Sequence, residues 1–184
     1  MVSFTGSTKT GRHVAREVSS RFGKTILELG GNNAAVIMPD ADLDMALKGC
    51  VFAAAGTCGQ RCTTLRRMLV HDSVFDKMAQ RMVSAYKTIK IGDPLDPSSL
   101  VGPLHKAHQI DTFKYGIAEA QKQGGKILHG GTILEGVEGN YVTPTIIEID
   151  SSAEIVKQEL FVPILYMMRF KTLEEAIEIN NSVP

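Results

Sequence analysis

The stretch RRMLVHDSVFDKMAQRMVSAYKTI, residues 66–89, carries two hydrophobic patterns in succession. Residues 66–71 end in a short apolar run, which predicts a buried strand. Residues 73–89 repeat apolar side chains at helical spacing, which predicts a helix with one face packed on the sheet. A strand that leads directly into a helix is typical of α/β folds. The helical positions that we expect to face the core are Val74, Met78, Met82 and Ala85.

The same alternation of short apolar runs and helical patterns extends along the rest of the chain. Further strands are expected at residues 2–5, 25–29, 34–38, 126–131, 141–149 and 164–170. Further helices are expected at residues 9–22, 40–56 and 109–124, and after a capping-box pattern at Thr172 and Glu175. These elements predict an α/β domain with a mostly parallel sheet flanked by helices.

The composition is typical of a soluble globular protein, with 43% hydrophobic and 22% charged residues in 184. Twenty basic residues balance twenty acidic ones without a long run of either sign, so no nucleic-acid or membrane partner is expected. The chain lacks an apolar stretch of about 18 residues and a secretory signal pattern. A reducing location is therefore expected, either the cytoplasm or an organelle matrix such as that of mitochondria.

The three cysteines are too few and too clustered for a disulfide framework. Cys50 lies in a helical pattern of small and apolar residues, so we assign it to the core. Cys58 and Cys62 form no zinc-binding pattern with the histidines that follow, so no metal site is expected. Cys62 follows Arg61 in a glycine-containing turn, where positive charge would favour a reactive thiolate. Cys62 is therefore a candidate nucleophile.

The stretch FTGSTKTGR, residues 4–12, follows one expected strand and opens one expected helix. Gly6 and Ser7 could offer backbone N–H groups and a hydroxyl at the positive end of that helix, where a phosphate is stabilised. Arg12 stands where a P-loop would have lysine, and no G-x-G-x-x-G pattern is present. A phosphate-binding loop and an ordinary strand-to-helix turn both fit this stretch.

The stretch LELGGNNAAVI, residues 27–37, places an acidic residue at the end of an apolar strand. Glu28 comes just before Gly30 and Gly31, which permit unusual backbone angles and the close approach of a ligand. A carboxylate in this position is either a surface cap or a general base at the rim of the sheet. The stretch alone supports both interpretations equally.

Four stretches together resemble the NAD(P)-dependent aldehyde dehydrogenase family. They occur in the order FTGSTKTGR, LELGGNNAAVI, GQRCTT and QELFVPIL, and the resemblance extends over essentially the whole chain. The spacing of Glu28, Cys62 and Glu159 also matches the register of that family. Within the family, the stretches GQRCTTLRR, VGPLHK, GNYVTPTI and PILYMMRF are most similar to the antiquitin group, which oxidises α-aminoadipic semialdehyde in lysine breakdown.

The resemblance implies an enzyme that oxidises an aldehyde to a carboxylate with NAD or NADP as hydride acceptor. Cys62 would be the nucleophile that forms a thioester, and Glu28 would activate the water that hydrolyses it. The cofactor would be contacted by Thr5, Gly6, Ser7, Leu29, Glu159 and Phe161. The sequence departs from the common Phe-Gly-Pro pattern at Val162, which puts the mobility of the cofactor in question.

Arg61 has three possible roles beside the nucleophile. It could bind the distal carboxylate of a semialdehyde acid through its planar fork, or it could favour the thiolate of Cys62. A surface arginine without a substrate contact is the remaining alternative. The resemblance to the antiquitin group favours the first role, and the substrate is then a semialdehyde acid.

The chain is shorter than members of this family. The resemblance implies a truncated protein, with residues 1–27 as the tail of the NAD-binding domain and residues 28–184 as most of the catalytic domain. We expect the isolated chain to have little dehydrogenase activity, and the intact protein to be a homo-oligomer. Two other interpretations remain: a noncatalytic assembly or binding module derived from this fold, and an unrelated thiol-dependent α/β hydrolase.

Overall fold

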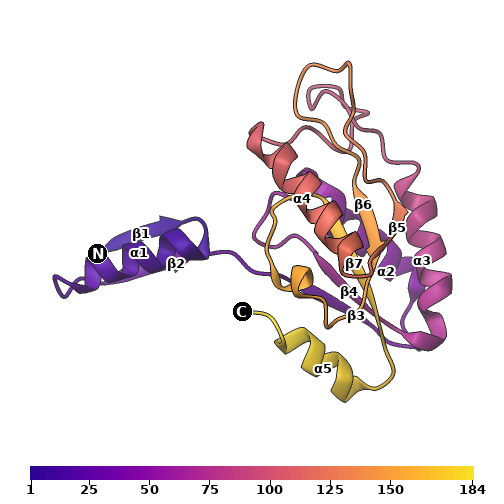
Figure 1. Ribbon diagram of the computed structural model, residues 1–184, viewed down its shortest axis with the longest axis horizontal. Helices are drawn as coiled ribbons and strands as arrows, with labels where there is room; N and C mark the ends of the chain where they lie inside the picture. The colour runs from indigo at the N-terminus through magenta and orange to yellow at the C-terminus, as the bar shows by residue number, and fades with distance from the viewer. The chain divides into compact units, whose positions relative to one another are not determined.

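The computed structural model describes residues 1–184, which divide into two compact units, Met1–Gly31 and Asn32–Pro184. Each unit has its own sheet, and Figure 1 labels the helices and strands of both. The domain boundary expected from the sequence, after residue 27, lies within the last residues of the first unit.

The first unit is a single strand–helix–strand motif. Its elements are β1 (Val2–Thr5), α1 (Thr8–Ser19) and β2 (Thr25–Glu28), with the two strands parallel. Ser7 caps α1, since its Oγ accepts a hydrogen bond from Thr10 N at 3.3 Å. A Cβ at Gly11 would lie 2.3 Å from a methyl group of Leu29, so glycine allows the helix to pack closely on the end of β2.

The second unit is built on a five-stranded sheet with the strand order β3-β4-β7-β6-β5. All neighbours in this sheet are parallel except β5, which pairs with β6 in the antiparallel sense. The strands are β3 (Ala34–Ile37), β4 (Arg67–His71), β5 (Lys126–His129), β6 (Thr145–Glu148) and β7 (Ile164–Phe170). The helices are α2 (Leu43–Ala55), α3 (Asp72–Tyr86), α4 (His108–Lys122) and α5 (Leu173–Asn181), with short 3₁₀ turns η1 (Gly56–Gly59) and η2 (Glu154–Lys157).

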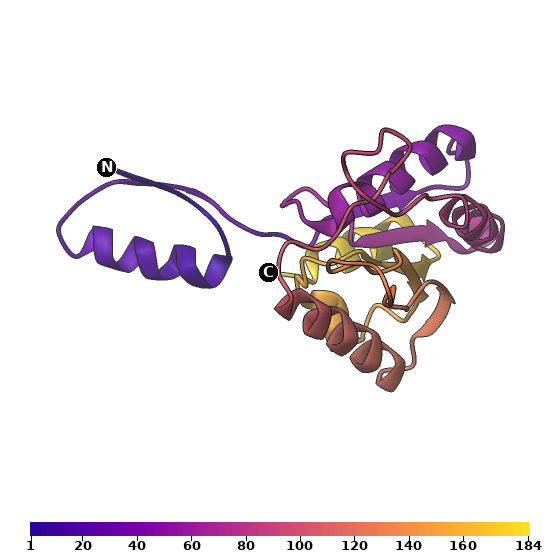
Figure 2. The same cartoon turned by 90° about the horizontal axis from the view of Figure 1, so that it is seen from above.

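Helices cover both faces of this sheet. Helices α2 and α3 lie on one face and α4 lies on the other (Figure 2). The methionines of β4, β7 and α3 fill the core, since Met68, Met78, Met82 and Met167 have no exposed surface. The predicted α/β fold with a mostly parallel sheet is confirmed, as are the core positions of the α3 methionines and of Cys50. None of the helices combines the length and apolar character needed to cross a membrane.

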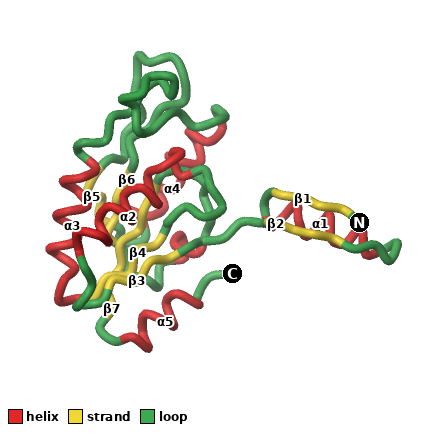
Figure 3. Tube along the Cα trace, turned by 180° about the vertical axis from the view of Figure 1, so that it is seen from behind, coloured by secondary structure: helices red, strands yellow, loops and turns green.

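Two long connections lie together at one end of the sheet, the segment that follows α3 and the segment between β5 and β6 (Figure 3). Leu104 N donates a hydrogen bond to Asn140 O at 2.9 Å, and Asn140 Nδ2 donates to Leu104 O at 3.3 Å. These two bonds fasten the connections to each other. The loops are thus ordered by backbone pairing although they contain no regular elements.

Arg67, the first residue of β4, is a buried cation that joins three segments. It is 2% exposed, and burial lowers its pKa. Its guanidinium donates to Asn32 O and Ile179 O at 2.8 Å and to Asn180 O at 3.0 Å. Two of these carbonyls end α5, where unpaired acceptors carry partial negative charge. Arg67 therefore fastens α5 and the segment before β3 to the middle of the sheet.

Replacing Arg67 by methionine is expected to lower the free energy of unfolding by about 2–4 kcal/mol, because three carbonyls, two of them in buried residues, lose a charged donor. Urea unfolding followed by circular dichroism measures this change. The matched control is Arg81→Met, which breaks an exposed ion pair with Asp44 and should change stability by less than about 1 kcal/mol. Equal losses for the two variants would show that Arg67 does not join these segments.

Candidate active site

Three loop segments meet at the amino ends of neighbouring strands. Because β3, β4 and β7 are adjacent and parallel, the residues just before each strand share one edge of the sheet. These segments are residues 32–33, 57–66 and 159–163. The edge therefore brings together four residues that the sequence singled out, namely Arg61, Cys62, Glu159 and Phe161.

The turn before β4 has an unusual backbone. Thr57, Cys58 and Gly59 have positive φ angles of 55°, 54° and 72°, in the left-handed region that residues with a Cβ avoid. A Cβ at Gly59 would lie 2.5 Å from the carbonyl carbon and oxygen of Val162. The turn is therefore pressed against the segment before β7. Strain of this kind persists only where the surrounding structure enforces it, and it concentrates at functional sites.

Cys62 is exposed at the end of this turn, whereas Cys50 and Cys58 are buried. Burial raises the pKa of Cys50 to about 11 and that of Cys58 to about 12. Asn33 Nδ2 donates hydrogen bonds to Cys62 O at 2.6 Å and Thr64 O at 3.0 Å, which fixes the backbone at Cys62 and just after it. The N–H of Cys62 makes no backbone hydrogen bond, so it is a free donor beside the sulfur.

Gln60 ties the turn to the long connections. Its Nε2 donates to Pro103 O at 3.3 Å, and its Oε1 accepts from His105 N at 2.9 Å. The stretch VGPLHK, residues 101–106, is in turn bonded to Asn140. The stretches that resemble the antiquitin group are thus physically connected to the turn that carries Cys62.

No group of three or more His, Cys, Asp or Glu side chains is arranged to hold a metal ion.

The side chain of Arg61 turns toward α2. Its Nη2 donates to Phe52 O at 3.2 Å, and its Cζ lies 5.0 Å from the centroid of the Phe52 ring. Nε is buried without a hydrogen bond, and Nη1 makes none within the chain. These contacts hold a half-buried guanidinium at the end of α2 and leave Nη1 as the donor that a ligand could meet.

Arg66 is a residue of this edge that the sequence analysis assigned only to a strand. Its side chain is 3% exposed, with Nη2 donating to Arg61 O at 2.9 Å and Nη1 to Thr64 O at 3.2 Å. Burial lowers the pKa of Arg66, and the neighbouring Glu159 carboxylate opposes that shift. The sequence signal is an arginine at the start of an apolar parallel strand, where a buried charge requires partners.

Glu159 and Phe161 present groups that fit a nicotinamide nucleotide. Glu159 Oε1 is buried 3.4 Å from Arg66 Nη2 without a hydrogen bond, and the side chain is 21% exposed, so its other oxygen, Oε2, is the one that can accept from a ligand hydroxyl. Phe161 has a φ of 57° and is 37% exposed, and its carbonyl accepts from Gln109 Nε2 at 3.4 Å. An available carboxylate oxygen and an exposed aromatic ring match the ribose and the planar ring of the cofactor that the resemblance implies.

In the first unit, the expected base and cofactor loop lie at the carboxyl ends of the two strands. Thr5 and Glu28 are partners in the ladder, and both are exposed. Gly6 N donates to Glu28 O at 3.0 Å, so this N–H is used within the unit. Ser7 Oγ is hydrogen-bonded to Thr10 N and to Thr10 Oγ1, so the N–H groups of Thr8 and Lys9 are the ones left to face a phosphate. Leu29 is half-buried, with its methyl groups against α1.

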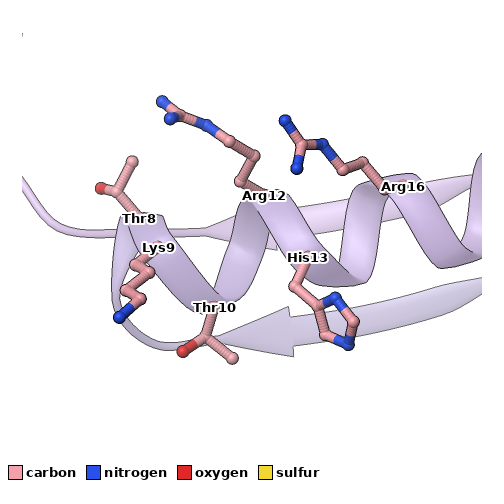
Figure 4. Close-up of a pocket in the computed structure, with 6 residues that line it drawn as sticks. All are labelled: Thr8, Lys9, Thr10, Arg12, His13 and Arg16. Atoms are coloured by element: carbon pink, nitrogen blue, oxygen red, sulfur yellow. The ribbon is translucent and has the colours of Figure 1, made fainter.

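Helix α1 presents basic side chains on its surface. Arg12 and Arg16 extend from one side of the helix, and Lys9 and His13 extend from another (Figure 4). The first turn contains no acidic residue. Lys9 and Arg12 add to the positive potential of the helix amino end, which favours a phosphate group there, whereas Arg16 lies in the last turn. The residues that line the surface pocket on α1 are Thr8, Lys9, Thr10, Arg12, His13 and Arg16.

Residues 1–184 match the family model for the aldehyde dehydrogenase family. The chain belongs to the aldehyde dehydrogenase family. It is 56% identical over 184 residues to aldehyde dehydrogenase family 7 member A1 of Brassica napus, and 48% identical over 184 residues to alpha-aminoadipic semialdehyde dehydrogenase of Rattus norvegicus. Both matches cover 100% of this chain but only 37% and 34% of the relatives, so the chain spans about a third of their length. The predicted family, and the resemblance to the antiquitin group within it, are confirmed.

Solved aldehyde dehydrogenases share the fold of the chain. Betaine aldehyde dehydrogenase of Staphylococcus aureus, in complex with NAD+, is 30% identical with a TM-score of 0.94, over 99% of this chain and 37% of that one. A 3,6-anhydro-L-galactose dehydrogenase in complex with NADP is 36% identical with a TM-score of 0.96, over 100% of this chain and 39% of that one. The predicted aldehyde dehydrogenase-like fold is confirmed, and a nicotinamide cofactor is indicated for the family.

We expect iodoacetamide to label Cys62 before Cys50 and Cys58, because only Cys62 is exposed and burial raises the pKa of the other two thiols. Limited alkylation at neutral pH, followed by peptide mapping, measures the order of labelling. The same reaction in urea is the control and should label all three cysteines. Preferential labelling of Cys50 in the folded chain would remove Cys62 as the reactive thiol.

Gly59→Ala is expected to lower the free energy of unfolding by about 3 kcal/mol or more, since an added Cβ meets the Val162 carbonyl in addition to the left-handed backbone penalty. Gly136→Ala is the matched control, because Gly136 has a similar φ of 77° with nothing within 4 Å of an added Cβ. The control should lose only about 1–2 kcal/mol. Urea unfolding compares the two variants, and equal losses would disprove the close approach of the turn to Val162.

Proposed function

We propose that this chain supplies the nucleophile and the base of an NAD(P)-dependent enzyme that oxidises an aldehyde to a carboxylate. The observation that carries the proposal is the exposed thiol of Cys62, which follows a strained turn at the edge that also presents Glu159 and Phe161. Membership in the aldehyde dehydrogenase family supports the same reaction. The substrate class, the thioester and the roles of individual residues are parts of this proposal.

Cys62 opens the reaction. Its thiolate sulfur attacks the aldehyde carbon, so a C–S bond forms and the carbonyl oxygen becomes an oxyanion. The free N–H of Cys62 is available to donate a hydrogen bond to this oxyanion, and Gly59 allows the turn that holds that N–H in place. The nicotinamide cofactor supplies the acceptor for the hydride that leaves the same carbon. A thioester on Cys62 is the result.

Glu28 completes the turnover. Its carboxylate accepts a proton from water as the water oxygen attacks the thioester carbon; the C–S bond then breaks, and the carboxylic acid leaves. Glu28 is exposed at the carboxyl end of β2, which suits a group that must meet water. Cysteine suits both halves of the reaction, because a thiolate is a good nucleophile and a good leaving group.

The chain offers two sets of groups to the cofactor. In the first unit, the Ser7 hydroxyl and the amino end of α1 would hold the diphosphate, with Thr5, Gly6 and Leu29 close by. In the second unit, Glu159 would accept from a ribose hydroxyl and Phe161 would pack against the nicotinamide ring. The basic side chains of α1 are compatible with both NAD and NADP.

Arg61 would select a substrate that carries a second acidic group. Arg61 comes one residue before Cys62 in the sequence, its guanidinium is held half-buried at the end of α2 by Phe52, and Nη1 remains for a carboxylate. A relative at 48% identity is named for α-aminoadipic semialdehyde, which contains such a carboxylate. We therefore propose a semialdehyde acid as the substrate.

Glu28→Gln is expected to form NADH in an initial burst and then turn over slowly, because an amide cannot accept the proton of the hydrolytic water. Stopped-flow absorbance of NADH measures both phases. The assay uses the complete gene product, a semialdehyde acid and NAD. Cys62→Ser is the companion variant and should lose the burst as well. An unchanged steady rate in Glu28→Gln would make Glu28 structural, and a burst in Cys62→Ser would refute the thioester.

Arg61→Ala is expected to raise KM for a semialdehyde acid at least about tenfold more than KM for an uncharged aliphatic aldehyde, since only the acid loses a charge-assisted pair. Steady-state kinetics with the two substrates measures the difference. The uncharged aldehyde is the internal control for damage to the turn. Equal increases for both substrates would point to activation of the thiol in place of recognition of a carboxylate.

A further inference from the structure

Arg66 is surrounded by the backbone of the nucleophile turn. Its Nη2 donates to Arg61 O at 2.9 Å and to Gly59 O at 3.4 Å, and its Nη1 donates to Thr64 O at 3.2 Å. These three carbonyls lie on both sides of Cys62 in the sequence. A single side chain therefore fixes the path of the backbone before and after the thiol.

The other side of the same guanidinium faces the segment before β7. Its Nη2 lies 3.4 Å from Glu159 Oε1, and its Cζ lies 5.5 Å from the centroid of the Phe161 ring. This pair holds the buried Oε1 of Glu159, and the Glu159 side chain is 21% exposed, so Oε2 is the oxygen that can accept from a ligand. The contact with Phe161 supports an aromatic residue whose φ of 57° is strained.

These contacts require the shape of arginine. A planar fork can donate to several carbonyls in its plane while its face stacks on an aromatic ring, whereas an ammonium group is a compact point charge on a flexible stem. Burial also means that the charge depends on all of these partners, because a buried cation without acceptors is strongly unfavourable. The turn and the segment before β7 therefore have one common support.

We propose that Arg66 is a positioning residue that holds Glu159 and Phe161 ready for the nicotinamide cofactor and, through the same group, fixes the turn that carries Cys62. Arg66 acts through these neighbours and does not itself contact the cofactor. The proposal rests on the proposed function in one respect, since it takes the ligand of Glu159 to be a nicotinamide nucleotide. It explains why a charged residue is buried between two loops that approach each other closely.

The test is a double-mutant cycle on cofactor binding, measured by calorimetry with NAD and with NADP in the protein as its gene encodes it. Arg66→Met is expected to raise Kd for the better-bound cofactor about tenfold, which is a loss of about 1.4 kcal/mol of binding free energy. In the Glu159→Gln background, Arg66→Met should raise Kd by less than about twofold, because Arg66 acts on the cofactor largely through this carboxylate. Arg66→Lys should recover part of the affinity, since it keeps the charge but not the fork. The control is Arg81→Met, an arginine of an exposed ion pair, which should leave Kd unchanged.

Each outcome of this cycle supports or overturns the positioning role. If the fold increases in Kd of Arg66→Met and Glu159→Gln multiply in the double variant, the positioning role is overturned. An unchanged Kd in Arg66→Met would also overturn it, and Arg66 would then be a stabilising core residue. If Arg66→Met shows no cooperative thermal transition, Arg66→Lys takes its place in the cycle, with a smaller increase in Kd that must still disappear in Glu159→Gln. If the wild-type protein binds the cofactor but oxidises no aldehyde, the proposed function is overturned and the double-mutant cycle still tests the positioning role. If the wild-type protein binds neither cofactor, the proposed function and the positioning role are both overturned.

Discussion

Two adjacent buried guanidinium groups organise the amino edge of the sheet. Arg66 and Arg67 are each 2% exposed, and a buried cation is stable only when acceptors surround it. Arg67 binds carbonyls at the end of α5 and before β3, while Arg66 binds carbonyls of the nucleophile turn. The requirement that both charges be satisfied thus fixes the end of α5 and the segments that lead into β3, β4 and β7.

The parallel sheet explains how residues far apart in the sequence form one site. The segments before β3, β4 and β7 share an edge because those strands are neighbours with the same direction. Gly59 then allows the turn to touch Val162 at a distance that no other residue permits, and Asn33 holds the carbonyl of Cys62 from the third segment. Close backbone packing holds the exposed thiol in one place, which is what the proposed nucleophile would need to meet its substrate in one geometry.

Much of this structure could be predicted from the sequence, because hydrophobic periodicity and glycine positions are local signals. The strand at residues 66–71 and the helix after it were recognisable for that reason. The orientation of Arg61 was not, since only the three-dimensional position of Phe52 shows that its guanidinium turns toward α2. Arg66 could not be singled out either, because a charged residue at a strand end is usually solvated and its partners come from loops far along the chain. The left-handed backbone of Cys58 has no sequence signal at all, since nothing but the surrounding packing enforces it.

Mass spectrometry of the acid-quenched protein during turnover is the most direct test of Cys62 as the carrier of the substrate. The protein as its gene encodes it would be mixed with NAD and α-aminoadipic semialdehyde, quenched within the first turnovers and digested. The expected result is a peptide containing Cys62 that is heavier by the acyl group, absent without NAD and more abundant in Glu28→Gln. NADH formation with no acyl group on Cys62, or an acyl group on another residue, would contradict the thioester and the site built around it.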